Sequence, residues 1–419
     1  MTRLNASDPE TMKGAKLPRL DWILLPGLSL LTINILAGSI VLMAGWLYPS
    51  SAAGLDGCFG KGDTSGDARA IPNSVCSERI VESEFVAEYR FNTRGDRAGM
   101  EYGPKPPGTY RIVMIGSSMA MGSFVPRERT FAALLPTELS GQTGRKVELY
   151  NEARGGRFRG GAYPTQSSAL QFDEVLSASP DLILWIVTPA DVGLVSFENF
   201  GPVPRATAED ISVPGKRTDR LATLWNKLKV EVAKGSLMET LRDRWERTTT
   251  SLVLKHLLYQ SESQGQYVTS YLENQDDAGF LKAEPSAKWQ RLLGIFQIRA
   301  AEIEGRARAA GVPLAVVLVP NRAQAAMISM GEWPAGYDPY KLGEELRAIV
   351  VSQGGTYIDI LPDFRKSPNP ERHYFPVDGH PDAGGHKIIA DFLATELTSG
   401  AIAPLRVAVQ PHAGLEQGR

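Results

Sequence analysis

Apolar residues in this chain form a few uninterrupted runs, which are separated by longer segments with helical spacing. Continuous apolar runs of roughly four to eight residues are typical of strands that are buried on both faces of a sheet. Mainly apolar runs predict strands at residues 110–115, 181–187 and 312–319, and the shorter, more mixed segments 146–151 and 355–360 predict two more. The intervening segments that predict helices are residues 130–139, 164–176, 288–310 and 386–397.

Strands that alternate with helices indicate right-handed crossovers and a parallel sheet with helices on both faces. We therefore expect an α/β fold over residues 109–398, with a doubly wound, flavodoxin-like, three-layer arrangement. One region, residues 195–287, breaks this alternation with several prolines, a helical stretch at about 221–260 and a polar segment. We expect a helical insertion that forms a lid or substrate wall, because such insertions often rise from the ligand-binding edge. An outer decoration without substrate contact is the alternative.

The longest apolar run lies near the N-terminus. Residues 22–48 contain no charged residue, and Trp22, Trp46 and Tyr48 stand at the two ends. A bilayer core about 30 Å thick needs roughly 20 helical residues, and aromatic rings favour its interfaces. The run therefore predicts an uncleaved transmembrane helix. A cleaved signal peptide and a buried helix are the alternatives, although the run exceeds the roughly 7–15 apolar residues of a signal peptide.

Charges around this run predict its orientation. Arg3, Lys13, Lys16 and Arg19 precede it, and the first positive residue after it is Lys61. Positively charged flanks are retained on the cytoplasmic side of a membrane. We expect residues 1–21 to form a cytosolic tail and the remainder of the chain to lie in the periplasm or outside the cell.

Residues 49–108 have no sustained apolar period and predict a stalk and an irregular approach segment. They contain the only two cysteines, Cys58 and Cys76. In an oxidising compartment, a disulfide between them would close a small loop and contribute about 3 kcal/mol of stability. Two unpaired thiols are the alternative, because a sequence gives no distance between them. Residues 399–419 are expected to form a C-terminal tail.

Composition and charge exclude several function classes. The chain has 419 residues, of which 43 % are apolar and 22 % charged, so it can bury a large core. The formal net charge is −2 and no long basic run is present, so we expect no nucleic-acid partner. The histidines lack the spacing of zinc ligands, and we expect no metal and no cofactor. Four histidines are expected in a helix, a loop or at the surface, namely His256, His373, His386 and His412.

The residue types needed for nucleophilic catalysis stand at the ends of predicted elements. Ser118 follows the strand at 110–115, whereas Asp378 and His380 precede the last helix. A serine hydroxyl needs an imidazole to take its proton and a carboxylate to orient that imidazole. Backbone N–H groups at Ser118 would stabilise the negative charge on an acyl oxygen. The alternative is that Ser117 and Ser118, and likewise Asp378 and His380, only shape turns or cap helices.

Three sequence blocks carry a resemblance to a known family. They are residues 112–118 (IVMIGSS) with Gly122, residues 151–156 (NEARGG) and residues 378–386 (DGHPDAGGH). In this order, each after a strand or before a helix, they resemble the blocks of the SGNH (GDSL-like) hydrolases. The resemblance covers about residues 109–398 without the insertion. It implies an SGNH-hydrolase-like fold and an esterase or acyltransferase activity.

The resemblance also implies roles for individual positions. Ser118 matches the nucleophile, His380 the general base and Asp378 the partner of that base. Gly156 matches a glycine whose N–H binds the oxyanion, although Gly155 and Gly156 could serve only a tight turn. Ser117 occupies the place that is usually held by aspartate.

One departure from the family pattern concerns the oxyanion site. Ala190 stands where the third block usually supplies an asparagine, after the strand at 181–187. Removing one oxyanion donor typically costs about 10²–10³ in turnover. Thr188, Asn321 and Arg322 are candidates for a substitute donor or for substrate binding. Otherwise the enzyme is slow or has lost activity.

Together these features predict a membrane-anchored, extracytoplasmic serine ester hydrolase or acyltransferase. Its expected substrate is an O-acyl group, above all O-acetyl, on a saccharide or a related envelope ester. A lipid or small-ester hydrolase with an apolar acyl groove would use the same residues. A catalytically degenerate binding or assembly protein of an envelope polysaccharide system is a further alternative, motivated by Ala190.

Overall fold

The computed structural model describes residues 21–47, 55–59, 69–80, 82–83, 85–155, 169, 172–193, 262–273, 278–376 and 378–406. The chain divides into two compact units, Met1–Pro49 with Pro214–Leu257, and Ser50–Val213 with Leu258–Arg419. In the first unit, the described element is the helix α1 (Asp21–Leu47), on which the side chains of Leu24, Leu28 and Leu36 are exposed. Among the described residues, no helix is both long enough and apolar enough to cross a membrane.

The second unit is built on a five-stranded parallel sheet. The strand order is β4-β3-β5-β6-β7, with β3 (Thr109–Ile115), β4 (Lys146–Asn151), β5 (Leu182–Val187), β6 (Leu314–Leu318) and β7 (Thr356–Ile358). Every residue of β3, β5 and β6 is buried, which explains why these strands read as nearly continuous apolar runs. The prediction of a parallel α/β sheet is confirmed.

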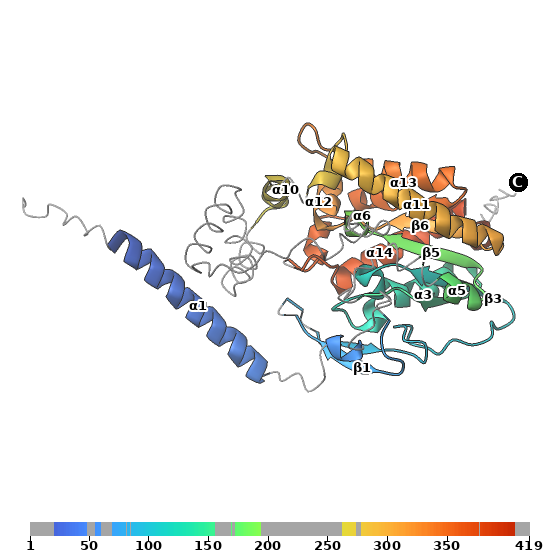
Figure 1. Ribbon diagram of the computed structural model, residues 1–419, viewed down its shortest axis with the longest axis horizontal. Helices are drawn as coiled ribbons and strands as arrows, with labels where there is room; N and C mark the ends of the chain where they lie inside the picture. Colours follow the sequence, from blue (N-terminus) through green and yellow to red (C-terminus); the bar gives the residue numbers. More distant parts are fainter. Residues whose placement is uncertain are drawn as a thin grey trace, which may run out of the picture. The chain divides into compact units, whose positions relative to one another are not determined.

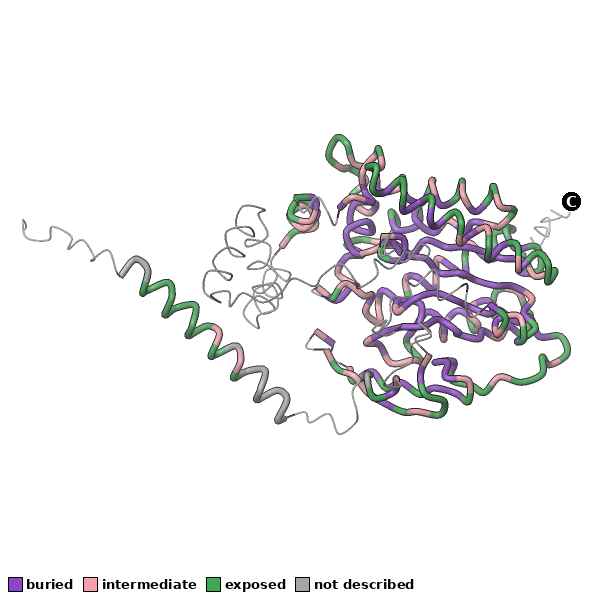
Figure 2. The backbone as a smooth tube through the Cα atoms, in the orientation of Figure 1, coloured by how far each residue is buried: buried purple, intermediate pink, exposed green. Residues whose placement is uncertain are grey.

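Helices cover both faces of the sheet (Figure 1). On one face, α3 (Phe131–Thr143) packs against α14 (Ala383–Glu396). On the other, α11 (Ala287–Ala309) packs against α6 (Pro189–Gly193) and α13 (Lys341–Ser352). The buried backbone follows the strands between these two layers (Figure 2). Shorter elements join them: α2 (Ser118–Met121), α5 (Phe172–Ser177), α12 (Arg322–Met330), η2 (Arg127–Arg129), η5 (Leu361–Lys366) and η6 (Pro370–His373).

The direction in which the sheet is built reverses at β3. The chain passes from β3 to β4 on one side and then returns to β5 on the other side of β3. In open parallel sheets, a crevice forms outside the carboxyl ends of the strands at such a reversal. Ser118 follows β3 and Ala190 follows β5, so the fold brings their two turns together at this edge.

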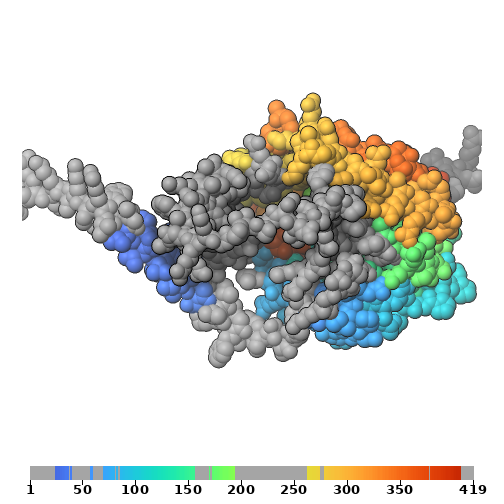
Figure 3. Space-filling model, viewed as in Figure 1, coloured from blue at the N-terminus to red at the C-terminus, as the bar shows by residue number. Residues whose placement is uncertain are grey.

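Part of the segment expected to be an irregular stalk is folded. Strands β1 (Val75–Glu78) and β2 (Ala87–Arg90) form an antiparallel hairpin, next to the short turn η1 (Leu55–Cys58). Cys58 and Cys76 form a disulfide, with Cα atoms 6.0 Å apart, so the predicted bond is present and the alternative of two free thiols is wrong. The hairpin lies at the opposite edge of its unit from α11 and α13 (Figure 3).

The expected insertion at residues 195–287 is described only in its last part. Residues 262–273 and 278–287 contain α10 (Gln264–Glu273) and η4 (Gly279–Leu281) and reach the start of α11. The helical stretch predicted at 221–260 lies outside the described residues, as does most of the helix predicted at 164–176. The expected tail begins within η7 (Leu397–Ala401) and continues through η8 (Ala403–Leu405), where Leu405 is buried.

Candidate active site

Ser118 stands on a tight turn at the carboxyl end of β3. Gly116 has a φ of 156°, and a Cβ atom built on it would lie 2.8 Å from the carbonyl oxygen of Ile186 in β5. Only glycine fits between the two strands at this point. The chain then enters α2 at Ser118, so the serine is held where the turn becomes a helix.

Ser118, His380 and Asp378 form a continuous hydrogen-bonded relay. The Oγ atom of Ser118 lies 2.8 Å from Nε2 of His380, and Nδ1 of His380 lies 2.5 Å from Oδ1 of Asp378. An ionised Asp378 accepts the Nδ1 proton, which leaves Nε2 as the acceptor for the serine hydroxyl. The side chains of His380 and Asp378 are 22 % and 27 % exposed, so the relay is open to a substrate.

The loop that carries the imidazole is itself fixed by backbone contacts. The N–H of Phe375 donates to the carbonyl of His380 at 2.8 Å, and the N–H of Gly379 donates to the carbonyl of Phe375 at 2.9 Å. Gly379 has a φ of 86°, a left-handed conformation that glycine adopts readily. The N–H of His380 also donates to Oδ1 of Asp378, at 3.1 Å. These bonds bring the two predicted side chains together within one turn.

Backbone N–H groups near Ser118 can bind an oxyanion. The first N–H groups of a helix have no partner within the helix, and Ser118 is the first residue of α2. Gly156, the second predicted donor, lies outside the described residues. Its neighbour Gly155 packs so closely that an added Cβ atom would lie 2.7 Å from the Cα atom of Ser118. The N–H of Gly155 points to the sulfur of Met121 at 3.3 Å, so it is not directed at the relay.

A cavity of about 490 Å³ opens over the relay. Apolar and aromatic side chains contribute to its lining, namely Phe280, Trp289 and Leu292, and α10 contributes Tyr271. Sequence reasoning missed these residues, because apolar side chains in a helical pattern are indistinguishable from core residues. The described end of the insertion therefore does contact the cavity, as a substrate wall would.

No family model matches the chain, and no curated protein matches it significantly. Among solved structures, it is similar to the crystal structure of TesA, with 10 % identity, a TM-score of 0.34 and coverage of 71 % of this chain and 99 % of that one. It is also similar to a lipase/acylhydrolase from Enterococcus faecalis, with 10 % identity, a TM-score of 0.35 and coverage of 69 % and 95 %. A third match is the psychrotrophic esterase EstA from Pseudoalteromonas sp., with 9 % identity, a TM-score of 0.32 and coverage of 68 % and 96 %.

The resemblance to the SGNH hydrolases thus rests on the three sequence blocks. The chemistry open to this domain follows from its own side chains.

The turn after β5 contains no asparagine that could bind an oxyanion. Ala190 is exposed and lines the cavity. Thr188, proposed as a substitute, donates its N–H and its hydroxyl to Oδ2 of the buried Asp191, at 2.8 Å and 2.9 Å. Burial raises the pKa of Asp191, and hydrogen bonds from Ser117 and Thr188 oppose that rise. Thr188 thus stabilises the turn. No pattern in the sequence predicts that Asp191 accepts these hydrogen bonds.

The other two candidates, Asn321 and Arg322, lie at the start of α12. Asn321 lines the cavity, caps the helix by accepting the N–H of Gln324 at 2.9 Å, and donates to the hydroxyl of Tyr271 at 3.1 Å. Arg322 donates to the carbonyl of Pro376 at 3.0 Å and stacks on the ring of Tyr267, outside the residues that line the cavity.

The two other histidines in the described residues, His386 and His373, have no hydrogen bond to the relay. His386 is fully buried in α14, as expected, and burial lowers its pKa to about 3, so it is neutral near pH 7. Its Nδ1 atom accepts the N–H of Phe131 at 3.3 Å. His373 is partly exposed, whereas His256 and His412 lie outside the described residues. Within the described part, no three side chains gather as a metal-ligand set would.

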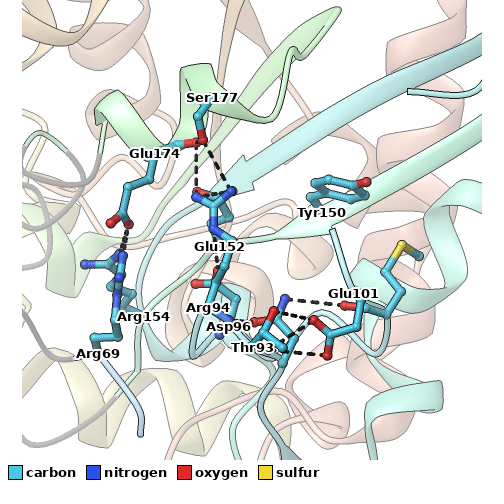
Figure 4. A network of polar contacts seen from close by, with 12 residues as sticks. Arg69, Thr93, Arg94, Asp96, Glu101, Tyr150, Glu152, Arg154, Glu174 and Ser177 are labelled. Atoms are coloured by element: carbon cyan, nitrogen blue, oxygen red, sulfur yellow. Dashed lines mark hydrogen bonds and ion pairs between the residues drawn. The ribbon is translucent and has the colours of Figure 1, made fainter. Parts of the chain in front are cut away.

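Five charged residues form a cluster, named the buried charge cluster for its buried members Asp96, Glu152 and Arg154; the partly exposed Arg94 and Glu174 complete it (Figure 4). Arg94 lies 3.7 Å from the carboxylate of Glu152 and 4.0 Å from that of Asp96, and it also donates to the carbonyl of Glu174 at 3.2 Å. Arg154 donates to the carboxylate of Glu174 at 2.8 Å. Burial raises the pKa of Asp96 to about 6 and that of Glu152 to about 8.

Proposed function

We propose that this chain is a serine ester hydrolase or O-acyltransferase in which Ser118 is the nucleophile, His380 the general base and Asp378 its orienting partner. The observation that carries the proposal is the relay of 2.8 Å and 2.5 Å contacts, which opens into a cavity. This arrangement has the geometry that activates a serine hydroxyl near neutral pH.

In the proposed acyl transfer, each group has a separate role. Oγ of Ser118 attacks the ester carbonyl while Nε2 of His380 takes the hydroxyl proton, and Asp378 stabilises the imidazolium. The oxyanion of the tetrahedral intermediate is bound by the N–H of Ser118 and by that of Gly156. The imidazolium then protonates the departing alcohol, which leaves an acyl-serine. Water or a saccharide hydroxyl, deprotonated by His380, releases the acyl group and restores the serine.

We place this domain outside the cytoplasm, held by residues 22–48 as a single transmembrane helix. Support comes from the charge-free run, from the exposed leucines of α1 and from the basic residues that precede it. The Cys58–Cys76 disulfide is in keeping with an oxidising compartment such as the periplasm. For an enzyme at that location, an O-acetyl or related O-acyl group on an envelope saccharide is the substrate we propose, by analogy.

The full chain in detergent, treated with a fluorophosphonate probe, tests the activated serine. Stoichiometric labelling of the parent, lost in Ser118→Ala and in His380→Ala, is the expected result. His373→Ala is the matched control, because this partly exposed histidine is not in the relay and its loss should leave labelling intact. A folded parent that does not label would contradict the proposal.

A lipid or small-ester hydrolase is a second candidate, favoured by the apolar wall of Phe280, Trp289 and Leu292. Each additional buried methylene contributes about 0.8 kcal/mol, or roughly fourfold in kcat/KM. A series of p-nitrophenyl esters separates the two candidates. A maximum at acetyl supports the O-acetyl substrate, whereas a rise beyond about eight carbons, abolished by Trp289→Ala, supports the lipid substrate.

A non-catalytic binding or assembly role is a third candidate, and the observation that favours it is Ala190. Saccharide binding that is unchanged in Ser118→Ala, together with no turnover by the parent, would support this role.

A further inference from the structure

Arg97 is a buried cation whose partners are mainly backbone carbonyls of the loop that follows the nucleophile. Its side chain is only 1 % exposed. The guanidinium donates to the carbonyls of Met121 at 3.2 Å, Gly122 at 2.5 Å and Val125 at 2.8 Å. A fourth bond, to the carbonyl of Glu88 at 2.9 Å, connects this loop to β2. One side chain thus binds three backbone carbonyls within residues 121–125, just beyond Ser118.

Tyr89 of β2 continues this contact toward the imidazole. Its ring lies under the guanidinium of Arg97, with 4.1 Å between the Cζ atom and the ring centroid. Its hydroxyl accepts the N–H of Phe124 at 2.8 Å. Phe124 has a φ of 65°, an unfavourable conformation for a residue with a side chain, which persists only where surrounding contacts impose it.

The ring of Phe124 packs edge-on against the ring of His380. The two ring centroids are 5.3 Å apart with an interplanar angle of 83°, and Phe375 packs on Phe124 in the same manner at 6.3 Å. The contact limits the directions in which the imidazole can turn. A second connection runs from Glu82, whose carboxylate accepts the N–H of Asp378 at 3.1 Å.

We propose that the segment from Glu82 to Arg97 is a brace for the catalytic relay, with Tyr89 and Arg97 as positioning residues. The inference rests on the proposed function. The two halves of the relay lie on separate loops, and the brace contacts both of them. A displacement of about 1 Å at a reacting atom can cost about 10² in rate, so fixing these loops contributes to turnover as well as to folding. In the β1–β2 hairpin, Tyr89 is the register partner of Cys76, so the disulfide anchors the brace.

The test compares Tyr89→Phe with Tyr102→Phe in the full chain. Tyr102 is a partly buried tyrosine whose buried hydroxyl oxygen has no hydrogen-bond partner among the described residues, so it controls for the loss of a buried hydroxyl. We expect Tyr89→Phe to lower kcat for a short ester about tenfold while KM stays within about twofold. Tyr102→Phe should leave both constants unchanged.

A second readout separates positioning from a general loss of stability. The proton between Nδ1 of His380 and Asp378 is observable by NMR, and its signal should broaden or shift in Tyr89→Phe only. At Glu82, the conservative Glu82→Gln keeps an oxygen acceptor and should retain the parent rate, whereas Glu82→Ala should not.

Equal losses of kcat in Tyr89→Phe and Tyr102→Phe would refute the proposed brace. It would also be refuted if Tyr89→Phe kept both the kcat and the His380 NMR signal of the parent. A parent without labelling or turnover would instead refute the proposed function. In that case the His380 signal of the Tyr89→Phe variant still decides whether the brace exists.

Discussion

The relay and the buried charge cluster both contain carboxylates, yet the two regions differ in how those carboxylates are satisfied. In the relay, Asp378 is 27 % exposed and hydrogen-bonded to His380. In the cluster, Glu152 is 1 % exposed, and neither of its carboxylate oxygens has a hydrogen-bond partner among the described residues. A carboxylate that lies near water and is hydrogen-bonded to an imidazole is suited to support proton transfer. A carboxyl group that is buried without a hydrogen-bond partner mainly has its pKa shifted. The strongly raised pKa of the Glu152 carboxyl therefore belongs to a structural cluster and not to the candidate active site.

The largest expected difference between the two regions is in turnover. His380→Ala should lower kcat by about 10⁴ or more, because the serine loses its base. Glu152→Gln should leave kcat close to that of the parent, because Glu152 does not line the cavity. Steady-state kinetics on a short ester measures both. Comparable losses in the two variants would mean that the cluster takes part in catalysis.

A smaller effect is expected from completing the oxyanion site on the relay side. Ala190 is exposed at the cavity wall, so an asparagine side chain has room there. One donor is typically worth about 10²–10³ in turnover, and we expect Ala190→Asn to recover at least about tenfold in kcat. Ala190→Leu, which adds bulk without a donor, is the control. An unchanged kcat in Ala190→Asn would indicate that another group already fills the role.

The last expected effect is on stability and not on turnover, and it concerns Glu152 in the charge cluster. Glu152 ionises near pH 4.5 in the unfolded chain but keeps its proton to about pH 8 in the folded protein. Between these values the folded state binds more protons, so the free energy of unfolding falls as the pH rises. We expect Glu152→Gln to remove a decline on the order of 3 kcal/mol in the free energy of unfolding between about pH 5 and pH 8.

Denaturant unfolding at the two pH values measures this decline. Glu344→Gln, at an exposed carboxylate, should behave as the parent does. If Glu152→Gln retains the full decline, other groups are responsible for it.

The strands and the relay could be predicted because each leaves a local signal in the sequence. Strands β3 and β5 are apolar throughout most of their length, and Asp378 and His380 occur two residues apart at the entrance to a helix. The β1–β2 hairpin left no such signal. In β2 buried and exposed residues alternate, but over four residues this pattern is too short to distinguish from an irregular segment.

Long-range packing was also beyond prediction. Arg97 is a charged residue that is buried because four carbonyls surround it, and those carbonyls belong to segments 9 to 28 residues away. Trp289 can lie at the cavity because Gly279 has no side chain. An added Cβ atom on Gly279 would come within 2.4 Å of the indole nitrogen, a close fit that only the folded chain defines. Both contacts depend on tertiary geometry rather than on residue pattern.

The hydrogen bond between Ser118 and His380 joins residues that are 262 positions apart. Closing so long a loop has an entropic cost that is offset only after the intervening sheet has formed. A chain that is still being synthesised therefore carries Ser118 without His380 beside it. Under the proposed function, reactivity of Ser118 would report that the chain has reached its final topology.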